Sequence, residues 1–77
     1  MLLRLLEYLV SFLADDPEGI QIDRIETPKV DLFFLRVQES DRGRILGRNG
    51  RTAEAIRDLM QTAAARLGKE AIIDIIE

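Results

Sequence analysis

The first fourteen residues constrain the fold of this chain most, because nearly all of them are apolar. Arg4, Glu7 and Ser11 are spaced three and four residues apart, so on a helix they form one narrow polar stripe. A helix that is apolar over most of its circumference is buried on more than one side. The stretch falls short of the roughly 18 uninterrupted apolar residues that a membrane-spanning helix needs. We predict a leading helix over residues 1–14, packed on the domain core, with another side available to a second protein chain.

Length and composition bound the class of protein. A chain of 77 residues forms a single domain, here residues 1–77, and buries only about 60% of its unfolded surface. The chain contains no Cys and no His, which excludes disulfides, the common zinc sites and catalysis by imidazole. We therefore expect no catalytic residue, no metal site and no cofactor. We also expect a cytoplasmic protein, with neither a membrane nor a small-molecule substrate among its ligands.

The charges are divided unevenly along the chain, although their sum is only −3. Residues 1–31 carry seven acidic and three basic side chains, a net charge of −4. Residues 42–57 carry five arginines and one acid, Glu54, a net charge of +4. The arginines are Arg42, Arg44, Arg48, Arg51 and Arg57. Because salt limits the reach of a charge to about 8–10 Å, the local sign decides which ligand is attracted, and residues 42–57 are expected to attract an anion.

Alternating apolar and polar residues predict three strands, over residues 20–24, 30–38 and 71–76. In the second strand we expect Phe33, Leu35 and Val37 to face the core, because successive side chains point to opposite faces of a sheet. Leu32 and Phe34 then lie on the other face and are half exposed unless another surface covers them.

Two further helices are predicted, over residues 39–46 and 53–67. Ser40 is the expected N-cap of the first, with Gly43 at a close-packed point. Apolar residues at three- and four-residue steps mark the core stripe of the second, which Gly68 ends. The element order is therefore helix, strand, strand, helix, helix, strand (αββααβ). This order predicts a two-layer α+β sandwich with three helices on one face of a three-stranded sheet.

The stretch Gly47-Arg48-Asn49-Gly50, here called the glycine loop, joins the last two helices. Two glycines three residues apart permit positive φ angles and remove side chains that would keep a phosphate backbone away. The loop leads into the N-terminus of the long helix, where free N–H groups and the positive end of the dipole favour an anion. Arg48 and Asn49 lie at the tip and can reach phosphates, while Arg44 and Arg51 flank it.

Other glycine motifs do not fit this stretch. A P-loop needs Gly-Lys followed by Ser or Thr, and a dinucleotide fingerprint needs a third glycine and a preceding strand. Gly-x-x-Gly alone is a weak signal, so the alternative is a corner between two helices with incidental arginines on a solvated face. The local charge of +4 and the position between two helices favour a site for a sugar–phosphate chain.

These features together resemble the KH-domain family in its type II topology, in which a helix leads the domain. The motif is Ile45-Leu46-Gly47-Arg48-Asn49-Gly50, followed by Arg51-Thr52 and, after three residues, by Ile56-Arg57. The resemblance runs from about residue 20 to residue 76, and residues 1–14 match the leading helix. A whole chain of one such domain is similar to small bacterial RNA-binding proteins with a single KH domain. Arg48 stands where many relatives have Lys, which keeps the charge and adds a planar donor.

The resemblance implies single-stranded RNA as the ligand, with about four nucleotides clamped by the glycine loop. It implies contacts of Gly47, Arg48, Asn49 and Gly50 with the sugar–phosphate chain and additional charge from Arg44 and Arg51. It also implies a groove with Ile45 or Leu46 in one apolar wall and residues 33–37 in the opposite wall. As partners it implies a second copy in a homodimer or a larger multidomain KH protein. As a cellular role it implies an RNA chaperone in cell-length and envelope regulation.

Two other functions are alternatives to RNA binding. The apolar first helix and the alanine-rich face of the long helix favour a protein-interaction or dimerisation module whose RNA binding is weak or secondary. An enzyme is disfavoured because no nucleophile has a base beside it. The turn acids Asp15, Asp16 and Glu18 are expected to be solvated. Glu54 is expected to pair with Arg57 on the helix surface. We therefore predict a non-catalytic RNA-binding protein, with the interaction module as the alternative.

Overall fold

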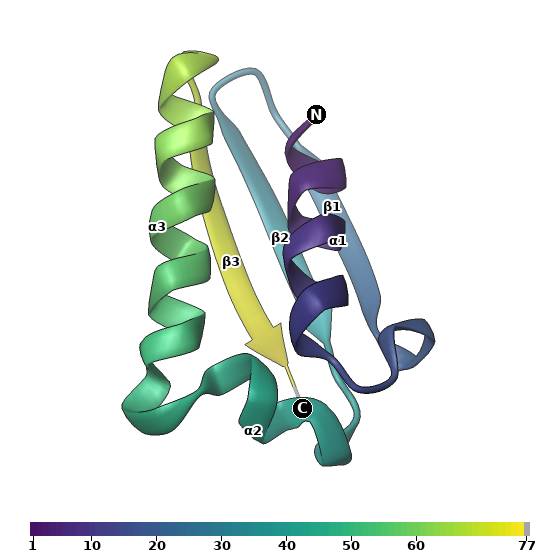
Figure 1. Cartoon of the computed structure of the whole chain (residues 1–77). Coiled ribbons are helices and arrows are strands. Elements are labelled where there is room, and N and C mark those ends of the chain that lie inside the picture. The colour runs from purple at the N-terminus through teal and green to yellow at the C-terminus, as the bar shows by residue number, and fades with distance from the viewer. Residues whose placement is uncertain (77) are drawn as a thin grey trace.

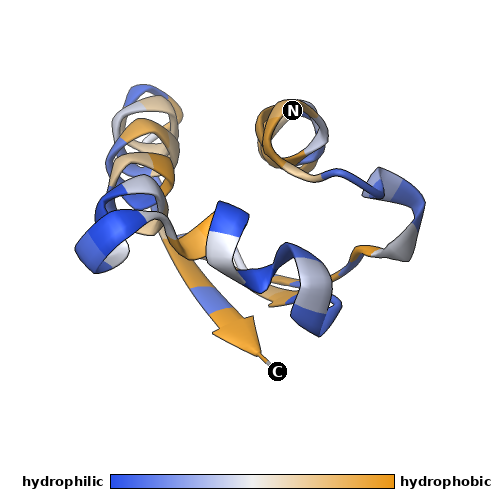
Figure 2. Cartoon of the chain, turned by 60° about the horizontal axis from the view of Figure 1, so that its bottom comes forward, coloured by the Kyte–Doolittle hydropathy of each residue, from blue (hydrophilic) through white to orange (hydrophobic). Residues whose placement is uncertain are grey.

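The computed structural model describes residues 1–76 and has the predicted αββααβ order (Figure 1). Its elements are α1 (Leu2–Leu13), β1 (Gln21–Glu26), β2 (Val30–Arg36), α2 (Glu39–Leu46), α3 (Arg51–Arg66) and β3 (Glu70–Ile76), with short 3₁₀ turns η1 (Pro17–Gly19) and η2 (Arg48–Gly50). The sheet has the order β1-β2-β3, with β1 antiparallel and β3 parallel to β2. Figure 2 shows α1 and α3 on the same side of the sheet. The predicted two-layer α+β fold is confirmed.

The core lies between the sheet and the helices. α1 contributes Leu2, Leu6 and Val10, which recur every fourth residue and therefore share one face of the helix. β2 contributes Phe33 and Leu35, both fully buried, so the prediction that the odd residues of this strand face the core is confirmed. α2 and α3 complete the core with Ile45, Ala53, Ile56, Met60 and Ala64.

The outer side of α1 remains uncovered within this chain. Tyr8 is 60% and Phe12 71% exposed, and their rings stack edge to face with centroids 4.8 Å apart. The side chains beside them, Leu5 and Leu9, are half-buried. The core therefore buries one side of α1, and an apolar strip on the other side faces solvent. None of the helices within residues 1–76 combines the length and the apolar character needed to cross a bilayer.

The face of the sheet that points away from the helices is also uncovered. Leu32 and Phe34 are half-buried there, as predicted. Leu32 lies opposite Ile25 on β1 and Ile72 on β3, which are 52% and 44% exposed. The three side chains form a short apolar row across all three strands, because directly paired residues point to the same face.

The start of α2 differs from the prediction. Gln38 is the N-cap residue and Ser40 lies inside the first turn, where it makes no capping bond. Asp41 is the buried polar residue of this turn. Its two carboxylate oxygens accept the backbone N–H of Asp15 at 2.8 Å and of Asp16 at 3.0 Å. The expected close-packed Gly43 is also wrong, because it is exposed with open space where a Cβ would lie.

Candidate nucleic-acid interface

The glycine loop takes a backbone path that few residue types adopt. Gly47 has φ +74° and ψ 174°, Asn49 has φ +58° and ψ 26°, and Gly50 has φ +74° and ψ 12°. Positive φ angles favour glycine, and asparagine is among the residues that tolerate them best. The glycines predicted from sequence therefore lie where the chain bends between α2 and α3.

The two glycines are required for different reasons. A Cβ on Gly47 would lie 2.6 Å from the Cβ and 2.8 Å from the backbone nitrogen of Thr52, in the first turn of α3. Gly47 is thus fixed by its φ angle and by the close approach of α3. A Cβ on Gly50 would meet no atom within 4 Å. Gly50 therefore leaves an open space beside the loop, where a ligand backbone can approach.

Hydrogen bonds inside the loop hold its shape and leave its tip unoccupied. The N–H of Gly50 donates to the Gly47 carbonyl at 3.1 Å, and the N–H of Arg51 donates to the Arg48 carbonyl. Arg48 and Asn49 are exposed, and no residue from 1 to 76 accepts their backbone N–H or bonds their side chains. The tip therefore presents free donors at the N-terminal end of α3, where the helix dipole also favours an anion.

The arginines around the loop fall into two groups. Arg48 and Arg51 are exposed, and in the described part of the chain neither forms an ion pair. Arg44 is also exposed, but its Nε lies 3.7 Å from Oδ1 of buried Asp41. Arg57 donates from Nε to the Ile73 carbonyl at 3.2 Å. The predicted Glu54–Arg57 ion pair is replaced by this contact with β3, which sequence spacing does not reveal.

The apolar residues before the loop occupy different environments. Ile45 is completely buried in the core, so it anchors the end of α2 to the core and presents no surface to a ligand. Leu46 is half-buried and remains accessible beside Gly47. Of the two candidates for a groove wall, Leu46 is therefore the one in reach of a ligand.

The predicted opposite wall, residues 33–37, does not have that position. β2 is the central strand, and its odd residues are buried under the helices. β3 pairs parallel to β2 and takes the edge beside α3. A shallow hollow of about 310 Å³ lies between α3 and β3 and is lined by Arg57, Asp58, Gln61, Ala71, Ile72 and Ile73. Arg57 follows Arg51 by six residues, about 9 Å along the helix, so this hollow begins close to the glycine loop.

A comparison with protein-family models agrees with this geometry. The model described as "KhpA/KhpB, KH domain" matches residues 4–75. The chain belongs to the KhpA/KhpB KH-domain family. The match includes most of α1, the glycine loop and nearly all of β3, so the resemblance inferred from the motif is confirmed over nearly the whole domain.

Curated relatives of this KH domain have similar lengths. "RNA-binding protein KhpA" of Borreliella burgdorferi is 36% identical over 75 residues, which cover 97% of this chain and 92% of the relative. The protein of the same name in Clostridium acetobutylicum is 32% identical over 73 residues, with 95% and 97% covered. That of Chlamydia trachomatis is 33% identical over 72 residues, with 94% and 92% covered. No solved structure gives a significant match.

Two contributors to the site in this KH domain were not anticipated from sequence. Thr52 lies directly against Gly47. The sequence position of Thr52, directly after Arg51, does not indicate this contact. Gln61 accepts the N–H of Ala71 with its side-chain oxygen at 2.8 Å. Gln61 lies four residues after Arg57, on the same face of α3, and this spacing was the available signal.

Proposed function

We propose that this KH domain is a non-catalytic, cytoplasmic protein that binds single-stranded RNA with its glycine loop. The observation that carries the proposal is the open tip of the loop, where free backbone donors and unpaired arginines meet the N-terminus of α3. Relatives that match nearly the whole chain are named RNA-binding proteins, which supports the same ligand.

In this proposal each part of the site has a defined role. Gly50 leaves space for the sugar–phosphate chain, and the N–H groups and side chains of Arg48 and Asn49 bind phosphate oxygens. Arg44 and Arg51 add positive charge beside the loop. Leu46 and the hollow between α3 and β3 receive the bases, while Ile45 holds the end of α2 in place.

The chemistry of this surface predicts weak sequence preference. The exposed aromatic residues Tyr8 and Phe12 lie on α1, away from the loop, so no aromatic platform for base stacking adjoins the phosphate site. Three or four phosphate contacts give a log–log dependence of affinity on salt with a slope of roughly −2 to −3 for single strands.

The decisive experiment replaces the tip of the loop. The double variant Arg48→Asp with Asn49→Asp places two carboxylates at the phosphate site, and aspartate tolerates the positive φ of position 49. We expect loss of RNA binding in fluorescence anisotropy with an unchanged circular dichroism spectrum. The control is Arg4→Asp with Gln21→Asp, which makes the same change of charge on exposed residues far from the loop. RNA binding that is unchanged in the loop variant contradicts the proposal, and equal loss in the loop variant and the control indicates an effect of net charge alone.

A second candidate function, a protein-interaction module, is favoured by the uncovered strip on α1. Tyr8 and Phe12 are more than half exposed, beside half-buried Leu5 and Leu9. In line with the family resemblance we propose that the protein forms a homodimer or a complex with a KhpB-type multidomain KH protein. The same resemblance underlies the proposal of an RNA chaperone role in cell-length and envelope homeostasis. Light scattering tests the homodimer, since a mass of 8.8 kDa at micromolar concentration contradicts it.

A further inference from the structure

The two edges of the sheet differ in whether their outward backbone groups are hydrogen-bonded. On β3, side chains of α3 occupy the outward edge, because Gln61 accepts the Ala71 N–H and Arg57 donates to the Ile73 carbonyl. β1 has β2 on one side and no strand on the other. No hydrogen bond from any residue between 1 and 76 reaches the outer edge of β1. An edge strand in this state presents unpaired N–H and C=O groups at every second residue, which is a template for another strand.

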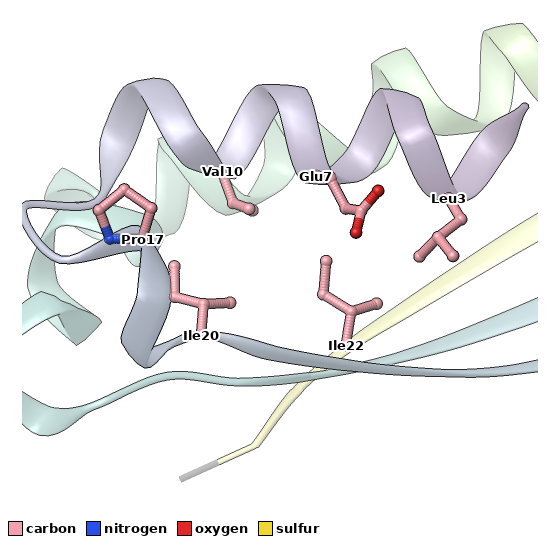
Figure 3. A pocket seen from close by; sticks show the side chains of 6 residues that line it. All are labelled: Leu3, Glu7, Val10, Pro17, Ile20 and Ile22. Atoms are coloured by element: carbon pink, nitrogen blue, oxygen red, sulfur yellow. The ribbon is translucent and has the colours of Figure 1, made fainter.

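A slot of about 210 Å³ lies directly beside this open edge, between α1 and β1 (Figure 3). Its lining residues are Leu3, Glu7, Val10, Pro17, Ile20 and Ile22. Five of the six are apolar, and the Glu7 carboxylate points from α1 into the slot toward Ile22. Within residues 1–76 this carboxylate has neither a hydrogen bond nor an ion pair. Apolar walls with one unpaired carboxylate fit a Lys or Arg side chain, whose methylene stem packs on the walls while its charged end meets Glu7.

The charge around the edge determines the class of partner. Residues 1–26, which form α1, η1 and β1, carry six acidic and two basic side chains, a net charge of −4, and Asp16 and Glu18 stand on either side of Pro17 at one end of the slot. Arg24, on the same strand, is already paired with Glu26 at 3.5 Å. Phosphate is repelled here. A second copy of the chain is also disfavoured, because it would place two acidic segments against each other. A basic polypeptide is the complementary partner.

We propose that β1 and the slot bind an extended basic segment of another protein, which adds to the sheet as a fourth strand beside β1. Its side chains on the helix side are Lys or Arg, one of which enters the slot and pairs with Glu7. Its alternate side chains are aliphatic and pack beside exposed Ile25 on the other face of the sheet. The site lies on the opposite side of the molecule from the glycine loop, so it neither uses nor requires RNA binding (Figure 1).

The test uses the full chain and a peptide of eight residues with blocked termini, in which Arg and Val alternate. We expect titration calorimetry near physiological salt to detect binding, and the backbone N–H groups of β1 to become protected from hydrogen exchange. Glu7 is exposed in the free protein and is covered by the peptide in the proposed complex, so Glu7→Gln is expected to weaken binding about tenfold, the effect of losing one charge-assisted hydrogen bond. The matched control is Glu54→Gln, the same substitution at an exposed residue of α3.

Three outcomes overturn the proposal. Equal weakening by Glu7→Gln and Glu54→Gln indicates attraction by net charge alone. Undiminished binding of the same peptide with alternate backbone nitrogens methylated indicates that no strand is added. Protection of the β1 amides in the protein alone, together with a doubled mass, indicates that a second copy occupies the edge. The loop variant Arg48→Asp with Asn49→Asp keeps the peptide site, so its peptide binding separates failure here from failure of the RNA proposal.

Discussion

The two ends of this KH domain use their charged residues in opposite ways. At the end where β1 turns into β2 and α3 leads to β3, Lys69 pairs with buried Asp31 and, at 3.4 Å, with Glu26. The N–H of Glu70 also donates to the Lys29 carbonyl at 2.8 Å. At the glycine loop, Arg48 and Arg51 have no partner among the described residues. Charges that are paired stabilise the fold, and charges that are left unpaired are available to a ligand.

The largest difference between the two ends is expected when one charged residue at each end is replaced by methionine. Lys69→Met leaves the Asp31 carboxylate buried without its partner, and we expect a drop of several degrees in the melting temperature. Arg48→Met removes an exposed side chain, so we expect its stability to change by at most about 0.5 kcal/mol. The effects of the two substitutions on RNA affinity should be in the opposite order to their effects on stability. Arg48→Met is expected to weaken RNA binding about tenfold, and folded Lys69→Met to bind as the wild type does.

Thermal melts and anisotropy titrations on both proteins check this prediction. Because both substitutions introduce methionine, the effect of the new side chain itself is matched. A melting temperature that falls for Arg48→Met and not for Lys69→Met contradicts the division of roles between the two ends.

The two glycines of the loop are expected to contribute differently, and by smaller amounts, to the free energy of unfolding. Gly47→Ala combines an unfavourable φ with a close approach to Thr52, and we expect it to cost about 2 kcal/mol or more. Gly50→Ala meets only the unfavourable φ, at a cost of about 1 kcal/mol. Gly43→Ala lies inside α2 with open space around it and serves as the control, with a gain of up to about 1 kcal/mol. Urea unfolding of the three variants measures this order, and equal costs at positions 47 and 50 contradict the contact with Thr52.

The smallest effect is the dependence of stability on pH at the paired end. The hydrogen bond that Lys69 donates to the Asp31 carboxylate raises the pKa of Lys69 above that of an ordinary lysine, against the opposing effect of burial. A raised pKa in the folded state stabilises the fold below the lysine pKa of the unfolded chain, and this contribution is lost as the pH rises through the folded value. The difference in unfolding free energy between wild type and Lys69→Met should therefore shrink above about pH 10.4. Urea unfolding between pH 8 and pH 11.5 measures it, and a difference that grows over this range contradicts the prediction.

The sequence was informative wherever one residue type determines local geometry. The alternation in β2 placed Phe33 and Leu35 correctly, and the glycine pair placed the loop between α2 and α3. Sequence reasoning failed where a contact depends on segments far apart in the chain. The parallel pairing of β3 makes β2 the central strand, so residues 33–37 could not form an open wall. No local sequence pattern indicates which strand pairs with β2 on its second side.

The acidic residues show the same division. Asp31 occupies an odd, core-facing position of β2, and this parity was a signal for a buried group that pairs with a cation. Asp41 lies one residue after Ser40, and both carry side chains suited to a helix start. Which of them is buried depends on the turn at Asp15 and Asp16, whose N–H groups need acceptors. These hydrogen bonds can be recognised only when the three-dimensional arrangement of the turn and α2 is known.

α3 runs without interruption for 16 residues, about 24 Å, from the glycine loop to the turn that precedes Lys69. Its buried residues Ala53, Ile56, Met60 and Ala64 recur along most of this length, so the core holds the helix between its two ends. We therefore expect loss of the ion pairs of Lys69 to leave the glycine loop in place, so that evolution or design can change the stability of this domain and its ligand affinity independently.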